Sequence, residues 1–381
     1  MARRTRPQPS PGEKQQCRIL HLIPQDSVGG VEVAARSMAM RRELPCDFML
    51  QLLAGRSLLP DKARVRESRF RSVNNPLAHL DAVFKILSAR PEVLICSLWR
   101  SMPVGLLVKL LRPQTLLVSF LHLEASTHLL DRVLNDLGMR FSDSVWADSA
   151  TTLSSRCKKP ARLPSCVISF VTERRAMTEP RVPRPAPRFV CWTRLHREKG
   201  VDRALRFMAL LLPKRPDASF EIWGPDGGER ANLERLAVEL GIQRNVSFQG
   251  PAPAEQLPAI AQRHSFYLQL SHHEGMAMAV VEAMQLGLVP VVAPVGEIQR
   301  YCQHRRTGLW SDTQRPEEAV QEVLRLLEDP GEYQAIQREA CQYWARAPLY
   351  ADDVCSAAER TRNAAAALLQ ANSGPRREQN R

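Results

Sequence analysis

The sequence lacks several features that mark common classes of protein. Aromatic residues make up only 6% of the 381 residues, and no zinc-finger spacing, basic zipper or aromatic-rich basic strand occurs. Positive charge alone is therefore weak evidence for nucleic-acid binding. The nine cysteines never form Cys-x-x-Cys, which predicts neither a zinc knuckle nor a disulfide framework. No apolar run approaches the ~20 residues that cross a bilayer. We expect a cytoplasmic protein without a nucleic-acid partner.

Familiar phosphate-binding motifs are also missing. There is no G-x-G-x-x-G, so the dinucleotide fingerprint fails. There is no Asp-x-Asp, the usual carboxylate handle for a metal-bound nucleotide diphosphate. His272 and His273 have no third ligand at metal spacing, so we expect neither a metal site nor a cofactor. Residues 1–16 are basic but have no apolar core of a signal peptide, which predicts a disordered tail.

The composition that remains is that of a folded protein with an uneven charge. Hydrophobic residues make up 44% and charged residues 24%, as in globular domains, and the length suits two or three of them. Residues 1–187 carry 29 Lys+Arg against 16 Asp+Glu, whereas residues 188–381 carry 24 of each. A basic half beside a neutral half indicates that the first half faces a polyanion or an anionic membrane surface.

Short apolar runs alternate with helical-period segments, as in repeated β-α units around buried parallel sheets. The expected strands are 18–23, 48–54, 93–99, 115–122, 145–149 and 166–170, then 189–195, 219–224, 246–250, 266–271 and 289–294. Residues 171–188 contain four prolines and are expected to form an extended linker. The sequence therefore predicts an α/β protein with two doubly wound, Rossmann-like domains facing across a cleft.

The expected domains follow from these segments. An N-terminal domain covers 17–183 and a C-terminal domain covers 184–346. Two helical segments, about 315–345 and 350–372, end the chain, with Pro348 between them. Residues 347–372 have no sheet of their own to follow, and 373–381 form a second disordered tail. Parallel sheets bind ligands at the carboxyl ends of their strands, so candidate residues are sought there.

Two motifs lie at strand-to-helix turns. Gly29 and Gly30 precede a helix that begins near Val31, where glycines allow close approach of a ligand and free N–H groups attract an anion. A simple tight turn explains this pair equally well. Arg194 and Lys199 follow strand 189–195 and could clamp a diphosphate, because fixed cations stabilise charge on a departing phosphate. A solvated pair of cations is the alternative.

The most specific stretch is SHHEGMAMAVVEAMQLGLVPVVAP at 271–294. Its two acids, Glu274 and Glu282, are eight residues apart, and either could accept hydrogen bonds from ligand hydroxyls at a helix directed toward the cleft. A paired structural charge is the alternative. His122 closes strand 115–122, where a position at the end of a strand favours the cleft, although a structural histidine would fit as well.

Together these residues resemble the family 4 retaining glycosyltransferases of GT-B fold. The matching pattern runs from Gly29-Gly30-Val31-Glu32, through Arg194-x₄-Lys199-Gly200, to Glu274-Gly275-x₆-Glu282-Ala283-Met284 and its buried strand. The resemblance is strongest over about 189–310, and it is sparse in the first half. It implies a metal-independent hexosyltransferase that uses a nucleotide-diphosphate sugar as co-substrate and acts on a hydroxyl acceptor.

The resemblance also implies roles for single residues. Arg194 and Lys199 would bind the donor diphosphate, Glu274 the donor sugar and Glu282 the ribose. Gly275, Met276 and Ala277 would offer backbone N–H groups, Gly29 and Gly30 would close on the donor from the N-terminal, acceptor-side domain, and His122 would lie near the transferred sugar. The helix at 347–372 would pack back on the N-terminal domain. Met276-Ala277, Ser169-Phe170 and Thr193 depart from the family pattern without removing a charge.

Other functions are compatible with the same residues. A GT-B sugar-nucleotide epimerase or phosphorylase, or an inactive sugar-nucleotide-binding scaffold, would use the same donor residues. Segment 56–71 holds six Lys/Arg against two acids together with four large apolar residues, and could rest on anionic lipid. If it does, the acceptor is expected to be lipid-linked or a cell-envelope polysaccharide or glycolipid, and the protein peripheral on the inner face of the membrane.

Overall fold

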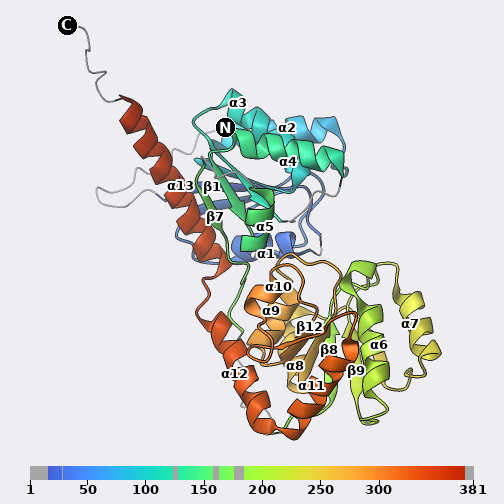
Figure 1. Cartoon of the computed structure of the whole chain (residues 1–381). Helices are drawn as coiled ribbons and strands as arrows, with labels where there is room; N and C mark the ends of the chain where they lie inside the picture. The colour runs from blue at the N-terminus through green and yellow to red at the C-terminus, as the bar shows by residue number, and fades with distance from the viewer. Residues whose placement is uncertain (1–15, 28, 123–127, 158–162, 176–183, 374–381) are drawn as a thin grey trace. The chain divides into compact units, whose positions relative to one another are not determined.

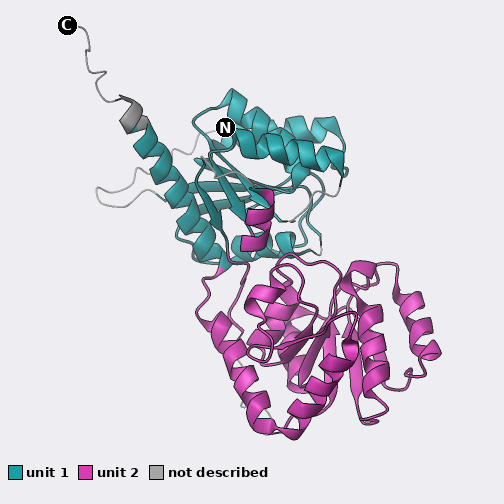
Figure 2. Cartoon of the chain, viewed as in Figure 1, with its two compact units in different colours: residues 1–147, 157–168, 350–381 teal, residues 148–156, 169–349 magenta. Residues whose placement is uncertain are grey.

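The computed structural model describes residues 16–27, 29–122, 128–157, 163–175 and 184–373. Apart from Gln16 and Ser373, the two predicted tails lie outside these residues. The chain forms two compact units, drawn in different colours in Figure 2: residues 1–147, 157–168 and 350–381 make the first, and residues 148–156 and 169–349 make the second. Each unit has its own parallel sheet, so the predicted pair of Rossmann-like domains is confirmed.

The first unit contains a seven-stranded sheet in the order β3-β2-β1-β4-β5-β6-β7, with every recorded pair parallel. Its strands are β1 (Arg18–Ile23), β2 (Asp47–Leu52), β3 (Val65–Arg66), β4 (Val93–Ser97), β5 (Leu116–Leu121), β6 (Ser144–Ala147) and β7 (Ser165–Val167). The central strand β4 is buried along its whole length, which is why it reads as an unbroken apolar run.

Helices cover both faces of this sheet. They are α1 (Gly30–Met40), α2 (Pro76–Ala89), α3 (Met102–Leu111), α4 (Leu129–Phe141) and α13 (Tyr350–Ser373). The chain leaves β1 in one direction and later crosses to β4 in the other, so right-handed connections place α1 on one face and α2, α3 and α4 on the opposite face. Figure 1 shows α2, α3 and α4 side by side, and α13 contacts α1.

A disulfide joins two distant parts of the first unit. Cys46, just before β2, is bonded to Cys355 in α13, across 309 positions of sequence. The sequence predicted no disulfide framework, and the spacing of the cysteines gave no sign of this pair. Only the packing of α13 brings the two Cα atoms to 5.8 Å. Cys96 and Cys191, which the sequence placed in apolar runs, are buried free thiols.

The second unit is built on a six-stranded sheet in the order β10-β9-β8-β11-β12-β13. Its strands are β8 (Arg188–Trp192), β9 (Ser219–Trp223), β10 (Val246–Gly250), β11 (Phe266–Gln269), β12 (Val289–Val292) and β13 (Leu309–Trp310). Its helices are α5 (Ala150–Arg156), α6 (Val201–Leu211), α7 (Arg230–Glu239), α8 (Leu257–Gln262), α9 (Met278–Gln285), α10 (Ile298–Tyr301), α11 (Pro316–Glu328) and α12 (Pro330–Ala345).

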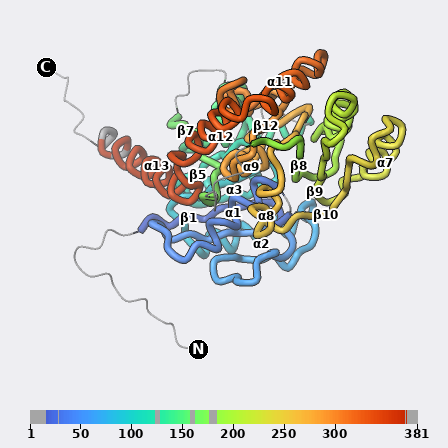
Figure 3. The backbone as a smooth tube through the Cα atoms, turned by 90° about the horizontal axis from the view of Figure 1, so that it is seen from below, coloured from blue at the N-terminus to red at the C-terminus, as the bar shows by residue number. Residues whose placement is uncertain are grey.

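The strand order of the second sheet defines its ligand-binding edge. From β8 the chain moves to β9 on one side and later returns to β11 on the other, so β8 and β11 flank the topological switch point. In Figure 3, β9 and β12 are labelled on opposite sides of β8. Ligands of open α/β sheets bind beside the carboxyl ends of the strands at this point. Arg194 and Lys199 follow β8, and Glu274 follows β11, so the topology directs these predicted site residues to one place.

Two predicted domain boundaries and one predicted helix differ from the structure. The unit boundaries fall at 168/169 and 349/350 rather than at 183/184 and 346/347, because Val171 already packs in the core of the second unit. The predicted helix at 315–345 is two helices, since Pro330 cannot continue α11 and the carboxylate of Asp329 caps α12 by accepting from the Glu332 N–H at 3.0 Å.

None of the helices in the described part of the chain combines the length and the apolar character that crossing a membrane requires.

Candidate functional site

Lys199 and Glu274 form the centre of the candidate site in the second unit. Lys199 ends the 3₁₀ turn η2 (Arg197–Lys199), and its Nζ lies 2.8 and 2.9 Å from the two carboxylate oxygens of Glu274. The Glu274 side chain is only 5% exposed, whereas that of Lys199 is 24% exposed. Lys199 is therefore the more exposed member of the pair, and Glu274 is buried.

Two further donors hold the Glu274 carboxylate. Gln269 Nε2, at the end of β11, and Ser271 Oγ each donate to Glu274 Oε1 at 2.8 Å. With Lys199, three donor groups fix this side chain, which compensates the burial of its charge. Glu274 is therefore preorganised as an acceptor, and Lys199 can turn toward an anion without leaving the carboxylate unpaired.

A buried chain of hydrogen bonds connects Glu274 with Glu282. Gln269 Oε1 accepts from the Tyr267 hydroxyl at 2.8 Å, and this hydroxyl accepts from the backbone N–H of Trp192 at 3.4 Å. The Trp192 indole Nε1 then donates to Glu282 Oε2 at 3.0 Å. Burial raises the pKa of the Tyr267 hydroxyl well above its usual range, so Tyr267 stays protonated in this chain.

Glu282 lies in α9 with an unexpected partner. Burial raises the pKa of this carboxyl, and the guanidinium of Arg175, 3.7 Å away, opposes the shift. The side chain of Arg175 is only 9% exposed, and it also pairs with Glu173. The sequence assigned Arg175 to a linker and missed its role; the one signal was its position four residues after the apolar stretch that ends at Val171.

The loop before α9 presents free backbone N–H groups. Within the described part of the chain, the N–H groups of Gly275, Met276 and Ala277 donate no recorded hydrogen bond. Ala277 adopts φ +52, an unusual value for alanine, and the Tyr301 hydroxyl donates to the Met276 carbonyl at 2.9 Å. A rigid loop with free N–H groups at a helix N-terminus is suited to oxygen atoms of an anionic or polar ligand.

Arg194 is a second cation that follows β8. Its side chain is exposed, and it has no recorded ion pair among the described residues. The Arg194 chain lies against Gly227, whose added Cβ would be 3.0 Å from Arg194 Cγ. Arg194 is thus available to a ligand, in contrast to Lys199, which is paired with Glu274.

In the first unit, Gly29 and Gly30 stand at the start of α1. Gly29 has φ −140, an extended value, so backbone conformation does not require glycine there. A Cβ at Gly29 would lie 2.4 Å from Glu32 Oε2, and Ser27 Oγ donates to the other oxygen of that carboxylate at 2.9 Å. The helix N-terminus is therefore already faced by an acid of its own first turn.

His122 follows β5 and belongs to a buried histidine–serine–histidine group. Ser97 Oγ, at the end of β4, lies 2.9 Å from His122 Nε2 and 2.8 Å from His21 Nε2. The hydroxyl has one hydrogen, so it can donate to only one ring and must accept from the other. The tautomers of His21 and His122 are therefore coupled through Ser97.

The buried His21 predicts a loss of stability in acid. Burial, with a smaller contribution from His122, lowers the pKa of His21 to about 3. Because an unfolded histidine titrates near pH 6.5, the unfolded state binds the extra proton between pH 6.5 and 3, and stability falls as pH falls through this range. At pH 5 the free energy of unfolding should be about 2 kcal/mol lower on this account than at pH 7.5.

Urea unfolding of wild type and His21→Gln at pH 5 and pH 7.5 measures this effect. In His21→Gln the free energy of unfolding should differ much less between the two pH values than in wild type. In His273→Gln, at an exposed position, it should differ as much as in wild type. Equal pH dependence in wild type and His21→Gln would show that His21 is protonated in the folded state.

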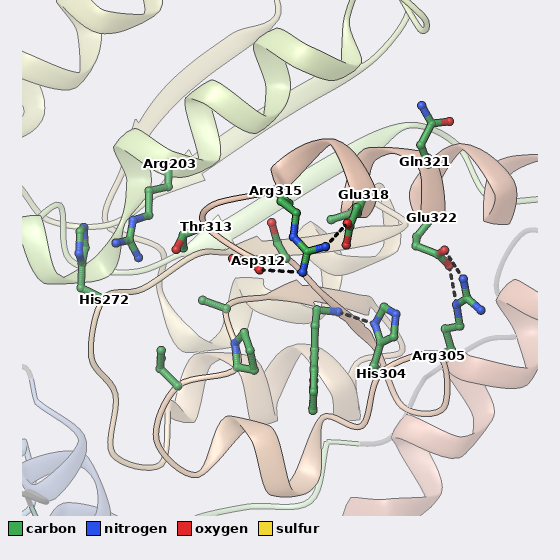
Figure 4. Close-up of a pocket in the computed structure, with 16 residues that line it drawn as sticks. Arg203, His272, His304, Arg305, Asp312, Thr313, Arg315, Glu318, Gln321 and Glu322 are labelled. Atoms are coloured by element: carbon green, nitrogen blue, oxygen red, sulfur yellow. Dashed lines mark hydrogen bonds and ion pairs between the residues drawn. The ribbon is translucent and has the colours of Figure 1, made fainter.

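The second unit also has a cavity of about 900 Å³ that borders this site. It lies at the carboxyl ends of β12 and β13, and its lining includes His272, whose backbone N–H donates to the carbonyl of Glu198 beside Lys199. None of the predicted site residues line it. Figure 4 shows that most of its cations are already matched: Arg315 pairs with Asp312 and Glu318, and Arg305 pairs with Glu322. The switch point, where Arg194 is exposed and unpaired, is the stronger candidate for an anionic ligand.

The second unit is similar in sequence to known glycosyltransferases. Residues 174–344, nearly all of the second unit, match the family model described as "Glycosyl transferases group 1". A D-inositol 3-phosphate glycosyltransferase of Corynebacterium urealyticum is 33% identical over 159 residues, 40% of this chain and 38% of the relative. A GDP-mannose:cellobiosyl-diphosphopolyprenol alpha-mannosyltransferase of Xanthomonas oryzae pv. oryzae is 29% identical over 129 residues, 34% of each chain. The chain therefore matches less than two fifths of the length of these relatives.

Solved structures resemble the chain over nearly its whole length. Anabaena HepE, crystallised with UDP and glucose, has a TM-score of 0.71 at 19% identity and covers 93% of this chain and 100% of its own. Sucrose-phosphate synthase of Thermosynechococcus elongatus has a TM-score of 0.71 at 15% identity, with the same coverage. At these identities the likeness establishes the fold, and it confirms the GT-B architecture expected from the sequence.

Proposed function

We propose that the chain is a metal-independent, retaining glycosyltransferase of family 4. It transfers a hexose from a nucleotide-diphosphate sugar to a hydroxyl acceptor, in the assembly of a cell-envelope polysaccharide or glycolipid. The observation that carries the proposal is the arrangement of Arg194, Lys199 and Glu274 at the switch point of a unit that matches the group 1 glycosyl transferases. No metal and no separate cofactor is part of the proposal.

The chemistry follows from where charge develops during transfer. As the bond between sugar and phosphate breaks, negative charge grows on the departing diphosphate, and fixed cations stabilise it more than they stabilise the intact donor. The exposed Arg194 and the partly exposed Lys199 supply this charge. The free N–H groups of Gly275, Met276 and Ala277 add hydrogen-bond donors for phosphate or sugar oxygens.

The two glutamates hold the neutral parts of the donor. Glu274 accepts from sugar hydroxyls, and Glu282 from the ribose hydroxyls, with the guanidinium of Arg175 beside the latter carboxyl.

The donor is the first property to test. The names of two comparison proteins mention a GDP-mannose donor and a complex with UDP-glucose, so these two nucleotide sugars come first. A true donor should raise the melting temperature of the full chain through mass action, and should release nucleoside diphosphate when acceptor is present. Arg194→Ala should bind it at least tenfold more weakly, whereas Arg235→Ala, on the exposed face of α7, should bind it as wild type does.

Three outcomes would contradict the transferase proposal. Conversion of donor without acceptor would indicate an epimerase, and a requirement for inorganic phosphate would indicate a phosphorylase. Donor binding without turnover over a broad panel of acceptors would indicate a scaffold. Product analysis by NMR separates the first two, and calorimetry beside the turnover assay identifies the third.

A further inference from the structure

The basic segment 56–71 provides a poor surface for lipid in the folded protein. Its cations are mostly engaged: Lys62 pairs with Glu67 at 2.5 Å, Arg69 pairs with Asp81 at 3.0 Å, and the guanidinium of Arg64 donates to the carbonyl of Arg42 at 3.0 Å. Of its large apolar residues only Leu58 is exposed. If the basic first unit contacts a membrane, another surface must do so.

Exposed apolar side chains gather on one layer of the first unit. Of the seventeen large hydrophobic residues that are exposed in the described chain, ten lie on α2, α3 and α4. They are Leu77, Leu80, Phe84, Leu110, Leu111, Leu129, Leu130, Val133, Leu137 and Phe141. These three helices pack side by side on one face of the first sheet (Figure 1), so the residues share one outer surface, here called the α2–α4 face.

The pattern along each helix shows that the apolar residues form stripes. On α4, Leu130, Val133, Leu137 and Phe141 follow one another at intervals of three or four residues, while Asp131 and Gly138, on a different side of the helix, are buried. On α2, the exposed residues Leu77, Leu80 and Phe84 have the same spacing, whereas Ala82 and Ile86 face the core. Both helices thus carry an apolar stripe on their outer side.

Three arginines without acidic partners border these stripes. Arg90 follows α2, and Arg132 and Arg140 lie on α4; all three are exposed, and none has a recorded ion pair among the described residues. The other basic residues on these helices, Lys85 and Lys109, are paired with Asp81 and Asp143. The exposed Asp136, also on α4, offsets one of these charges, so the α2–α4 face combines exposed apolar surface with a surplus of positive charge.

We propose that the α2–α4 face docks the protein on an anionic lipid membrane. Apolar side chains flanked by arginines match the boundary between acyl chains and anionic headgroups, where each kind of group finds its preferred environment. A second copy of the chain fits less well, since a two-fold interface through this face would bring the unpaired arginines of both copies together. The proposal does not depend on the donor site, which is built from the second unit.

Vesicle sedimentation tests the apolar component. Full-length protein should pellet with vesicles of phosphatidylglycerol and phosphatidylcholine. The triple variant Phe84→Gln/Leu110→Gln/Leu129→Gln, with one highly exposed residue from each helix, should bind at least tenfold more weakly. Two controls should bind within twofold of wild type: Met40→Gln/Val238→Gln, which removes exposed apolar residues elsewhere, and Leu58→Gln, which probes segment 56–71.

A charge variant tests the electrostatic component. Each arginine near an anionic surface changes the partition coefficient about fivefold, so Arg132→Gln/Arg140→Gln should weaken binding to the anionic vesicles about 25-fold. Binding to pure phosphatidylcholine should not change, and raising the salt concentration should abolish the difference between wild type and variant. Melting temperature and donor binding should stay at wild-type values in every variant, which separates this test from that of the donor site.

Several results would overturn the proposal. Wild type that pellets equally with neutral and anionic vesicles, or with neither, would exclude an anionic membrane as the partner. Loss of binding in Leu58→Gln but not in the triple variant would return the role to segment 56–71. A wild-type dimer in analytical ultracentrifugation that becomes monomeric in the triple variant, with no lipid binding, would show that a second copy covers this face.

Discussion

Lys199→Ala is expected to slow turnover of the donor about 10²- to 10³-fold, because the departing diphosphate loses a cation placed where charge develops. It should also lower the free energy of unfolding by about 2 kcal/mol, since the Glu274 carboxylate, 5% exposed, keeps only its two neutral donors. Steady-state kinetics and urea unfolding measure the two effects. Lys214→Ala, at an exposed lysine, should change neither by a measurable amount.

A double variant separates the catalytic effect from the structural one. In Lys199→Ala/Glu274→Gln the buried side chain is a neutral amide that needs no cation, so most of the lost stability should return. Turnover should stay as low as in either single variant, because both donor contacts are gone. Strictly additive losses of stability would show that the pair is not coupled, and wild-type turnover in Lys199→Ala would refute the diphosphate clamp.

Gly200→Ala is expected to destabilise the protein by about 3 kcal/mol. Gly200 links η2 to α6 with φ +61, and a Cβ at this position would lie 1.9 Å from the carbonyl oxygen of Leu270. Alanine therefore has to bear the left-handed conformation and also force two backbone segments apart. Because these segments carry Lys199 and Glu274, we expect donor affinity to fall together with the free energy of urea unfolding.

Gly241→Ala supplies the matched control for Gly200→Ala. Gly241 has a similar φ of +71, but no atom lies within 4 Å of an added Cβ. Its substitution should cost only the conformational component, about 1 kcal/mol, and should leave donor binding unchanged. If the two variants are equally stable, the close approach of Leu270 to Gly200 is not a constraint on the fold.

The fold class was predictable because parallel strands buried on both faces leave continuous apolar runs in the sequence. All eleven predicted strands overlap an observed strand, whereas β3 (Val65–Arg66) and β13 (Leu309–Trp310) were missed, since two residues make no recognisable run. The break between α11 and α12 was missed although Pro330 marks it. The helical spacing of apolar residues continues on both sides of that proline, so this spacing gave no sign that one helix ends and another begins.

The site was predictable only in part. Residues at the carboxyl ends of strands, such as Lys199 and Glu274, could be grouped because the topology directs strand ends to one edge. The supporting residues could not, since Tyr267, Gln269 and Trp192 come from strands and act through contacts across the sheet. Gln269 did give a signal, because a polar residue inside an apolar strand needs a partner when it is buried.

By itself, the sequence determined two sheets of parallel strands, the polar residues at their ends and a basic first half, because apolar periodicity and charge are local properties that a linear chain displays. Only the tertiary structure decided which charges remain unpaired: it joined Lys199 to Glu274 and engaged much of segment 56–71, yet left Arg194, Arg132 and Arg140 exposed. The physical reason is that pairing of charges, and the bonding of Cys46 to Cys355, depend on distances between segments far apart in the chain.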